Sequence, residues 1–262
     1  MSWEWVHTLV QRYLDEGESA SEARSTRPHS NPSATDEFVR GLIIELRHDL
    51  TAQGLDAGPV TIVWHLKERG LTAPSTSTIR RILTDDNLVT PEPKKRPKSS
   101  LRRFEAAQPN ECWQSDFPPQ AGGAPARWAL ADGTDVEILN WLDDHSRLLL
   151  ACTLFARVTG DDVVDVFTHT ANEYLPATLR IVQKNGHPGH PQTQAKIERF
   201  HQTLKKWLHR QPAAETLGEL QSQLDLFRSI YNTQRPHRAV KGSTPWQAYQ
   251  ATIKARPTAE AD

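Results

Sequence analysis

The 262-residue chain carries 31 Lys and Arg against 32 Asp and Glu, so its formal net charge of −1 and pI of about 6.8 neither favour nor exclude nucleic acid as a partner. The length predicts one large or two small domains with ample core. Two cysteines exclude a disulfide framework, and the longest apolar run, residues 148–155, is far too short to span a membrane, so we expect a soluble cytoplasmic protein with no membrane partner.

Residues 1–34 are predicted to form an amphipathic helix and a linker. Large apolar residues recur on one helical face between positions 2 and 14. They are Trp3, Val6, Leu9, Val10, Tyr13 and Leu14. From Glu16 to Ala34 the composition changes to Ser, Glu, Arg, Pro and Asn, which is typical of a mobile linker. A domain boundary is therefore expected near Thr35.

Residues 35–90 contain three short helical patterns. The first begins after Thr35 and ends near Gly54, the second spans residues 59–70, and the third starts after Ser75. Three short helices with a tight connection between the last two match a helix-turn-helix DNA-binding domain. A three-helix bundle used for protein contacts is the alternative.

In a helix-turn-helix domain, the third helix enters the major groove of DNA. The residues expected near its exposed N-terminal side are Ser75, Ser77, Thr78, Arg80 and Arg81. A Pro-rich basic linker, residues 91–109, follows. Its basic residues are Lys94, Lys95, Arg96, Lys98, Arg102 and Arg103. Such a segment should be extended, and its charge should neutralise DNA phosphates.

After the linker the pattern changes to strands. Residues 112–117 form a short apolar strand in which Asp116 is anomalous, because strand interiors are depleted in aspartate. Residues 136–142 and 147–155 predict two further strands joined by a hairpin turn at residues 143–146. The two aspartates of that turn are interpreted as turn residues rather than metal ligands, because turns use aspartate routinely.

Further along the chain, Thr159 is expected to cap a helix that Pro176 closes, and residues 178–183 predict a last short strand. A helix over residues 191–208 follows. Its apolar face is Ile197, Phe200, Leu204 and Leu208, and its polar stripe is Gln194, Glu198, His201 and Lys205. Between residues 184 and 210, Glu198 is the single acid among six basic residues. Glu198 is either a solvated acid paired with a neighbouring lysine or a ligand for a divalent cation.

Four stretches in order resemble the DDE transposases and integrases of bacterial insertion sequences, which are related to retroviral integrase. They cover most of residues 110–250, and they are Trp113-Gln114-Ser115-Asp116, residues 142–147, residues 190–201 and Tyr231-Asn232-Thr233-Gln234-Arg235-Pro236-His237-Arg238. The resemblance implies an α/β (α+β) fold, in which an RNase H-like integrase core with a mixed sheet flanked by helices follows a small all-α helix-turn-helix domain. The core would occupy residues 110–210, with its C-terminal helical part and tail at residues 211–262.

The resemblance also implies the site. Asp116 and Glu198 would be catalytic and would hold Mg²⁺ or Mn²⁺, because phosphoryl transfer on DNA uses paired hard cations with carboxylate ligands. Basic residues of the same helix would contact DNA, and they are Lys196, Arg199, Lys205 and Lys206. The implied partners are double-stranded DNA, as element ends and target, and further copies of the chain in a homo-oligomer on DNA. The implied location is the bacterial cytoplasm, at the nucleoid.

The chain departs from the family at the second aspartate. From Tyr174 to Ile197 it contains no Asp or Glu, so a strand end, the second Asp and the helix between them are interpreted as deleted. The N-terminus begins where the family would already be in the last helix of a first helix-turn-helix. Both departures indicate a degenerate copy.

Three hypotheses follow. The first is an active enzyme in which another acid replaces the missing one, and the candidates are Asp132, Asp135, Glu137, Asp143 and Asp144. The second, which we favour, is a catalytically inactive relative that binds DNA sequence-specifically at element ends through residues 36–103. The third is an RNase H-type nuclease, which would share the fold but would not need the N-terminal module.

Overall fold

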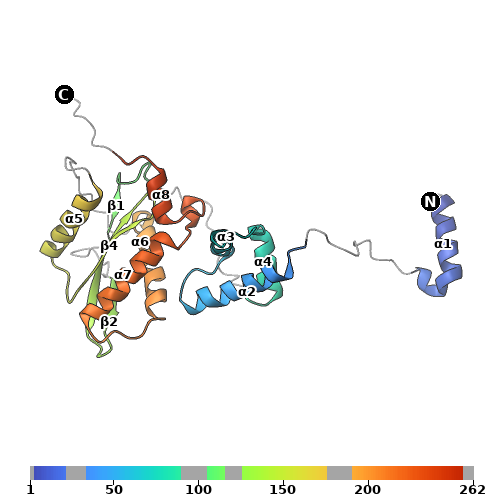
Figure 1. The fold of residues 1–262 in the computed structure, drawn as a ribbon, viewed down its shortest axis with the longest axis horizontal. Coiled ribbons are helices and arrows are strands. Elements are labelled where there is room, and N and C mark those ends of the chain that lie inside the picture. Colours follow the sequence, from blue (N-terminus) through green and yellow to red (C-terminus); the bar gives the residue numbers. More distant parts are fainter. Residues whose placement is uncertain (1–2, 22–33, 90–104, 116–125, 176–190, 256–262) are drawn as a thin grey trace, which may run out of the picture. The chain divides into compact units, whose positions relative to one another are not determined.

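The computed structural model describes residues 3–21, 34–89, 105–115, 126–175 and 191–255 (Figure 1). The chain divides into two compact units, Met1–Asp36 and Glu37–Asp262. The predictions made for residues 22–33, 90–104, 116–125, 176–190 and 256–262 lie outside the described residues. They include the basic residues of the linker, Asp116 and the predicted strand 178–183.

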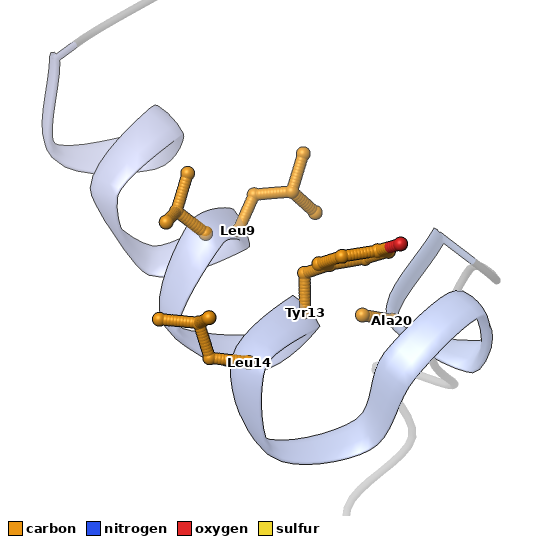
Figure 2. A pocket seen from close by; sticks show the side chains of 5 residues that line it. Leu9, Tyr13, Leu14 and Ala20 are labelled. Carbon is orange, nitrogen blue, oxygen red and sulfur yellow. The ribbon is translucent and has the colours of Figure 1, made fainter.

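The first unit contains α1 (Trp3–Glu16), which confirms the predicted amphipathic helix. The start of the predicted linker instead forms a short 3₁₀ helix, η1 (Gly17–Ser21), because Gly17 adopts a left-handed φ of +66° that reverses the chain. Ala20 thereby becomes buried. It lines an apolar cavity of about 270 Å³ together with side chains of α1 (Figure 2), and the lining residues are Leu9, Val10, Tyr13, Leu14 and Ala20. Apart from the Tyr13 hydroxyl the lining side chains are apolar, so this cavity offers no acid–base pair and no set of metal ligands.

The three helices predicted in residues 35–90 are confirmed as α2 (Glu37–Ala52), α3 (Pro59–Glu68) and α4 (Thr76–Asp85). Their apolar residues form one core, which consists of Ile43, Leu46, Ile62, Leu66, Ile79, Ile82 and Leu83. Arg47 of α2 closes this bundle, because its guanidinium donates to the carbonyl oxygens of Ala57 at 2.8 Å and Leu88 at 2.9 Å. We call residues 37–89 the helical module.

The described strands form an antiparallel sheet around β3 (Asp135–Asp143). One edge of β3 pairs with β4 (Leu149–Phe155), and the other edge pairs with both β1 (Trp113–Gln114) and β2 (Ala126–Ala129). The predictions of β3, β4 and the turn between them are confirmed. The predicted start of β4 was two residues early, because Arg147 adopts a left-handed φ of +66° that keeps the chain in the turn.

Strand β2 was not predicted from the sequence. It has only four residues, so no alternating pattern could reveal it, and its strand character comes from pairing with β3. From Trp113 to Ala126 the chain advances 13 residues, while their partners on β3, Asp143 and Ile138, are 5 apart. β1 and β2 are therefore not one continuous strand along this edge. The expected mixed sheet stays a prediction, because the described strands pair only antiparallel.

Helices cover both faces of the sheet (Figure 1). On one face, Ile138 and Leu142 of β3 pack into a core with α6 (Pro191–Leu208) and α7 (Leu217–Thr233). On the other face, Trp141 meets Phe167 of α5 (Gly160–Tyr174), with ring centroids 5.0 Å apart. The predicted cap of α5 is confirmed, because Thr159 forms a capping box with Asp162. After α7, a 3₁₀ turn, η2 (Arg238–Val240), leads to α8 (Pro245–Ala251).

Asn232 joins α7 to β4 through the backbone. Its side-chain oxygen accepts a hydrogen bond from the N–H of Leu149 at 2.9 Å, and its side-chain nitrogen donates to the Leu149 carbonyl at 2.9 Å. The amide thereby satisfies both polar groups of a buried strand residue. This explains why a polar side chain is buried at the end of α7.

We predict that Asn232→Leu lowers the free energy of unfolding by roughly 1–3 kcal/mol, because the buried N–H of Leu149 loses its acceptor and the Leu149 carbonyl keeps only the hydrogen bond from Nε of Arg228. The measurement is urea denaturation of the full chain. Thr233→Ala is the matched control, since Thr233 is exposed and its hydroxyl bonds only within α7, to the Ser229 carbonyl. An equal effect of the two substitutions would contradict the assigned role of Asn232.

Candidate active site and nucleic-acid interface

The acid-bearing helix α6 lies on the sheet as its apolar spacing predicts. Ile197, Phe200, Leu204 and Leu208 are all buried, and Trp207 joins them in the same core. Glu198 is exposed on the opposite side of this helix. A stripe of buried residues on one side therefore presents the carboxylate of Glu198 to solvent.

Lys196, two residues before Glu198, has an internal partner. Its ammonium lies 2.5 Å from Oδ1 of Asp144, whose side chain is fully buried. Burial lowers the pKa of the Lys196 ammonium below its ordinary value, and the hydrogen bond to Asp144 opposes this only in part. The resemblance implies a DNA contact for Lys196, but the structure directs its charge toward the sheet.

His201, three residues after Glu198, lies on the predicted polar stripe, at its border with the buried side of α6. Its Nε2 donates a hydrogen bond to Oδ1 of Asn140, at 2.9 Å, and the ring is half-buried. Burial, together with the charge of Lys205, lowers the pKa of His201 to about 4. The physical reason is helical geometry, because His201 is four residues after Ile197 and three before Leu204 and so borders the buried stripe.

The Asp143–Ser146 turn is a closed hydrogen-bonded unit. Oδ1 of Asp143 accepts from the N–H and the hydroxyl of Ser146, at 2.7 and 2.5 Å, and Oδ2 accepts from the N–H of Asn110 at 2.8 Å. Burial raises the pKa of Asp143, which these hydrogen bonds partly oppose. The interpretation of this aspartate as a turn residue is confirmed.

Asp144, the next residue, binds two other segments of the chain, residues 106–114 and α6. Its Oδ2 accepts from the N–H of Ala106 at 2.8 Å, and its Oδ1 accepts from Nε2 of Gln114 at 2.5 Å and from Lys196. The guanidinium of Arg147 lies 3.6 Å from Oδ1. Asp144 is therefore also a structural turn residue, with both oxygens engaged.

The other acids considered as substitutes are engaged locally or lie at a strand end. Oδ1 of Asp132 accepts from the N–H of Thr134 at 2.8 Å, within its own turn. Glu137 accepts from the N–H of Val158 at 2.9 Å. Asp135 is exposed at the start of β3. Across the described ranges, no three His, Cys, Asp or Glu residues gather in a way that could hold a metal ion.

The third helix of the helical module presents the residues expected to contact DNA. Ser75, Ser77, Arg80 and Arg81 are exposed, and Thr78 is half-buried. Ser75 caps the helix, because its hydroxyl accepts from the N–H of Thr78 at 3.1 Å. On α6, the exposed basic residues are Arg199, Lys205 and Lys206. Contact of any of these side chains with DNA stays a prediction.

The stretch at residues 231–238 is built into the fold. Tyr231 is buried in the core shared by α6 and α7, and the Arg235 guanidinium lies 5.0 Å from the centroid of its ring. The same guanidinium forms an ion pair with Asp56 at 2.5 Å. Together with Asn232, these residues serve packing and positioning.

Sequence reasoning missed Asn140 as a site residue. It is fully buried in the middle of β3, where it pairs with His201. Asparagine is depleted in strand interiors, as aspartate is, so the signal that marked Asp116 also existed at Asn140. Gln114 carried no such signal, because its bond to Asp144 depends on how β1 meets the turn.

Residues 179–245 match the integrase core domain. The matched range contains α6 with Glu198, all of α7, and the stretch at residues 231–238. The match supports an integrase- or transposase-like catalytic core in this part of the chain. Core domains of this type generally use divalent metals and suggest DNA as a partner. Of the described helices, none has the length and apolar character needed to cross a membrane.

We predict that His201 makes unfolding pH-dependent. Its pKa in the folded chain, about 4, lies below the ordinary 6.5, so the unfolded state binds the extra proton first as the pH falls. Stability should therefore drop by about 1 kcal/mol between pH 7 and pH 5.5 through this residue. The drop in the free energy of unfolding is measured by urea denaturation of the wild type and of His201→Gln at both pH values. An identical pH dependence in both proteins would contradict the assignment.

Proposed function

We propose that the chain is a DDE-type transposase or integrase of a bacterial insertion sequence, in degenerate form, whose family acts in DNA transposition or integration by metal-dependent phosphoryl transfer. The observation that carries the proposal is the integrase core match over a helix that buries its apolar face and exposes a single acid, Glu198. Asp116 and Glu198 are the proposed catalytic and metal-binding residues.

A pair of Mg²⁺ or Mn²⁺ ions fits the described acids only in part. Mg²⁺ takes oxygen ligands and uses one or two carboxylates with waters and phosphates. Glu198 is exposed and suits this, whereas the oxygens of Asp143 and Asp144 are already engaged inside the protein. The sequence offers no acid between Tyr174 and Ile197. The residues at hand therefore fall short of a three-carboxylate set, which supports lost or much reduced catalysis.

DNA binding is the function expected to persist. The helical module, with Arg80 and Arg81 exposed on α4, is proposed as a helix-turn-helix that recognises element ends. The basic residues of the linker and the exposed basic residues of α6 would neutralise phosphates. This reading includes the alternative function, an inactive, sequence-specific end-binding protein. We also propose that it acts as a homo-oligomer on DNA in the bacterial cytoplasm, at the nucleoid.

The first prediction of this proposal concerns activity. Purified full-length protein with Mg²⁺ or Mn²⁺ should give no measurable cleavage or strand transfer on its own element's ends, while it still binds them. The reason is that members of a catalytic unit act together, so loss of one ligand commonly costs orders of magnitude in rate. Gel assays of labelled end DNA measure both properties. Robust metal-dependent strand transfer that Glu198→Gln abolishes would show an active enzyme instead.

The second prediction concerns salt. If all six basic residues of the linker contact phosphates, replacing them with alanine should reduce the slope of log K against log[salt] by up to about 5, at roughly 0.9 per phosphate. The six are Lys94, Lys95, Arg96, Lys98, Arg102 and Arg103. Fluorescence anisotropy of end DNA between low and moderate salt measures it.

Arg80→Ala is the comparison for that experiment. It should weaken binding to the end sequence more than binding to unrelated DNA, because a groove-reading residue carries specificity. An unchanged salt slope in the six-residue variant would remove the linker from the interface. An equal loss on all sequences for Arg80→Ala would remove α4 as the reader.

A further inference from the structure

Two polar contacts join α6 to the sheet, one on each side of Glu198 in sequence. Lys196 reaches Asp144 just after the end of β3, and His201 reaches Asn140 in the middle of β3. Five residues of helix advance about 7.5 Å, whereas four residues of strand advance about 13 Å. The long side chain of Lys196 spans the difference. The two contacts therefore attach the helix at two separated points.

The two acceptors are themselves fixed. Both Asp144 and Asn140 are fully buried. Asp144 is held by the N–H of Ala106 and the side chain of Gln114, and Asn140 pairs with Cys152 of β4. Both acceptors therefore lie in the buried core of the fold.

The apolar contacts of α6 do not define its rotation as sharply. Ile197, Phe200 and Leu204 bury surface, and that stabilisation is non-directional. A hydrogen bond weakens steeply when its angle or length changes. A small rotation of α6 that keeps its apolar stripe in the core would lengthen or bend both hydrogen bonds, so they select one orientation within the range that the apolar contacts allow.

We propose that Lys196 and His201 are positioning residues, and that the Lys196–Asp144 and His201–Asn140 contacts set the direction in which α6 presents Glu198. The proposal rests on the proposed function, in which Glu198 is an acid of the site. Lys196 acts inside the protein on this account, and the phosphate-binding residues of α6 are the exposed ones.

The first test measures binding of Mn²⁺ to the full chain from the electron paramagnetic resonance signal of free Mn²⁺. Glu198→Gln defines the part of the binding that depends on Glu198. Lys196→Met and His201→Leu should each weaken that part by about 10–100-fold, the range typical of residues that orient a metal ligand. His201→Gln keeps a donor for Asn140 and should stay within about threefold of wild type. Gln202→Met, an exposed change on the same helix, is the matched control.

The second test separates positioning from DNA contact by salt dependence. Lys205→Met should reduce the slope of log K against log[salt] by about 0.9, because it removes a phosphate contact. Lys196→Met should leave the slope unchanged. An equal reduction in both variants would show that Lys196 binds phosphate and would overturn its positioning role.

The third test measures amide hydrogen exchange of α6, which reports whether the helix is held in place independently of Mn²⁺ binding. Lys196→Met and His201→Leu should raise exchange in α6 at least about tenfold over the control, and His201→Gln should restore protection. If Lys196→Met and His201→Leu both keep the Mn²⁺ affinity and the amide exchange rates of the wild type, the inference is overturned. Absence of Glu198-dependent Mn²⁺ binding in the wild type would count against the proposed site instead. The exchange measurement would still decide whether the Lys196–Asp144 and His201–Asn140 contacts position α6.

Discussion

The buried carboxylate of Asp144 connects the turn after β3 to two parts of the chain that are distant from it in sequence, residues 106–114 and α6. It accepts hydrogen bonds from the N–H of Ala106, from Gln114 of β1 and from Lys196 of α6. A fully buried carboxylate is tolerated only when it is paired and hydrogen-bonded, and removal of one partner of such a pair costs about 3–5 kcal/mol. The positions of β1 and α6 relative to the end of β3 are therefore tied to one another through a single side chain.

Because Lys196 ties α6 to the sheet, the two sides of this helix carry different kinds of residue. The side toward the sheet carries the apolar stripe and, at its borders, the polar contacts of Lys196 and His201. The side toward solvent carries Glu198 and the remaining basic residues. A polyanion that approaches this surface meets one acid within a positive field, and the integrase core match covers the same helix. The acids of the adjacent turn are already used for structure, so they do not extend the set of ligands around Glu198.

Local sequence patterns predicted those helices and strands that are long enough to show a periodic spacing of apolar residues. The 3.6-residue spacing of Ile197, Phe200 and Leu204 predicted both α6 and its buried side, and the Pro and Ser before α4 predicted its start. The same reasoning did not reveal the partner of His201, because the contact made by a residue at the border of an apolar stripe depends on what lies opposite it. It missed β2, because four residues carry too little pattern to distinguish a strand from a loop.

The sequence by itself determined helices α1 to α6, the two long strands, the turn character of Asp143 and Asp144, and the isolation of Glu198 among basic residues. Those features depend on neighbours within a few positions along the chain. Only the tertiary structure decided that Asp144 and Lys196 form a buried pair, that Asn140 meets His201, and that Asn232 completes the hydrogen bonds of Leu149. These partners lie 52, 61 and 83 residues apart, and their pairing depends on the stacking of helices on the sheet rather than on any local spacing.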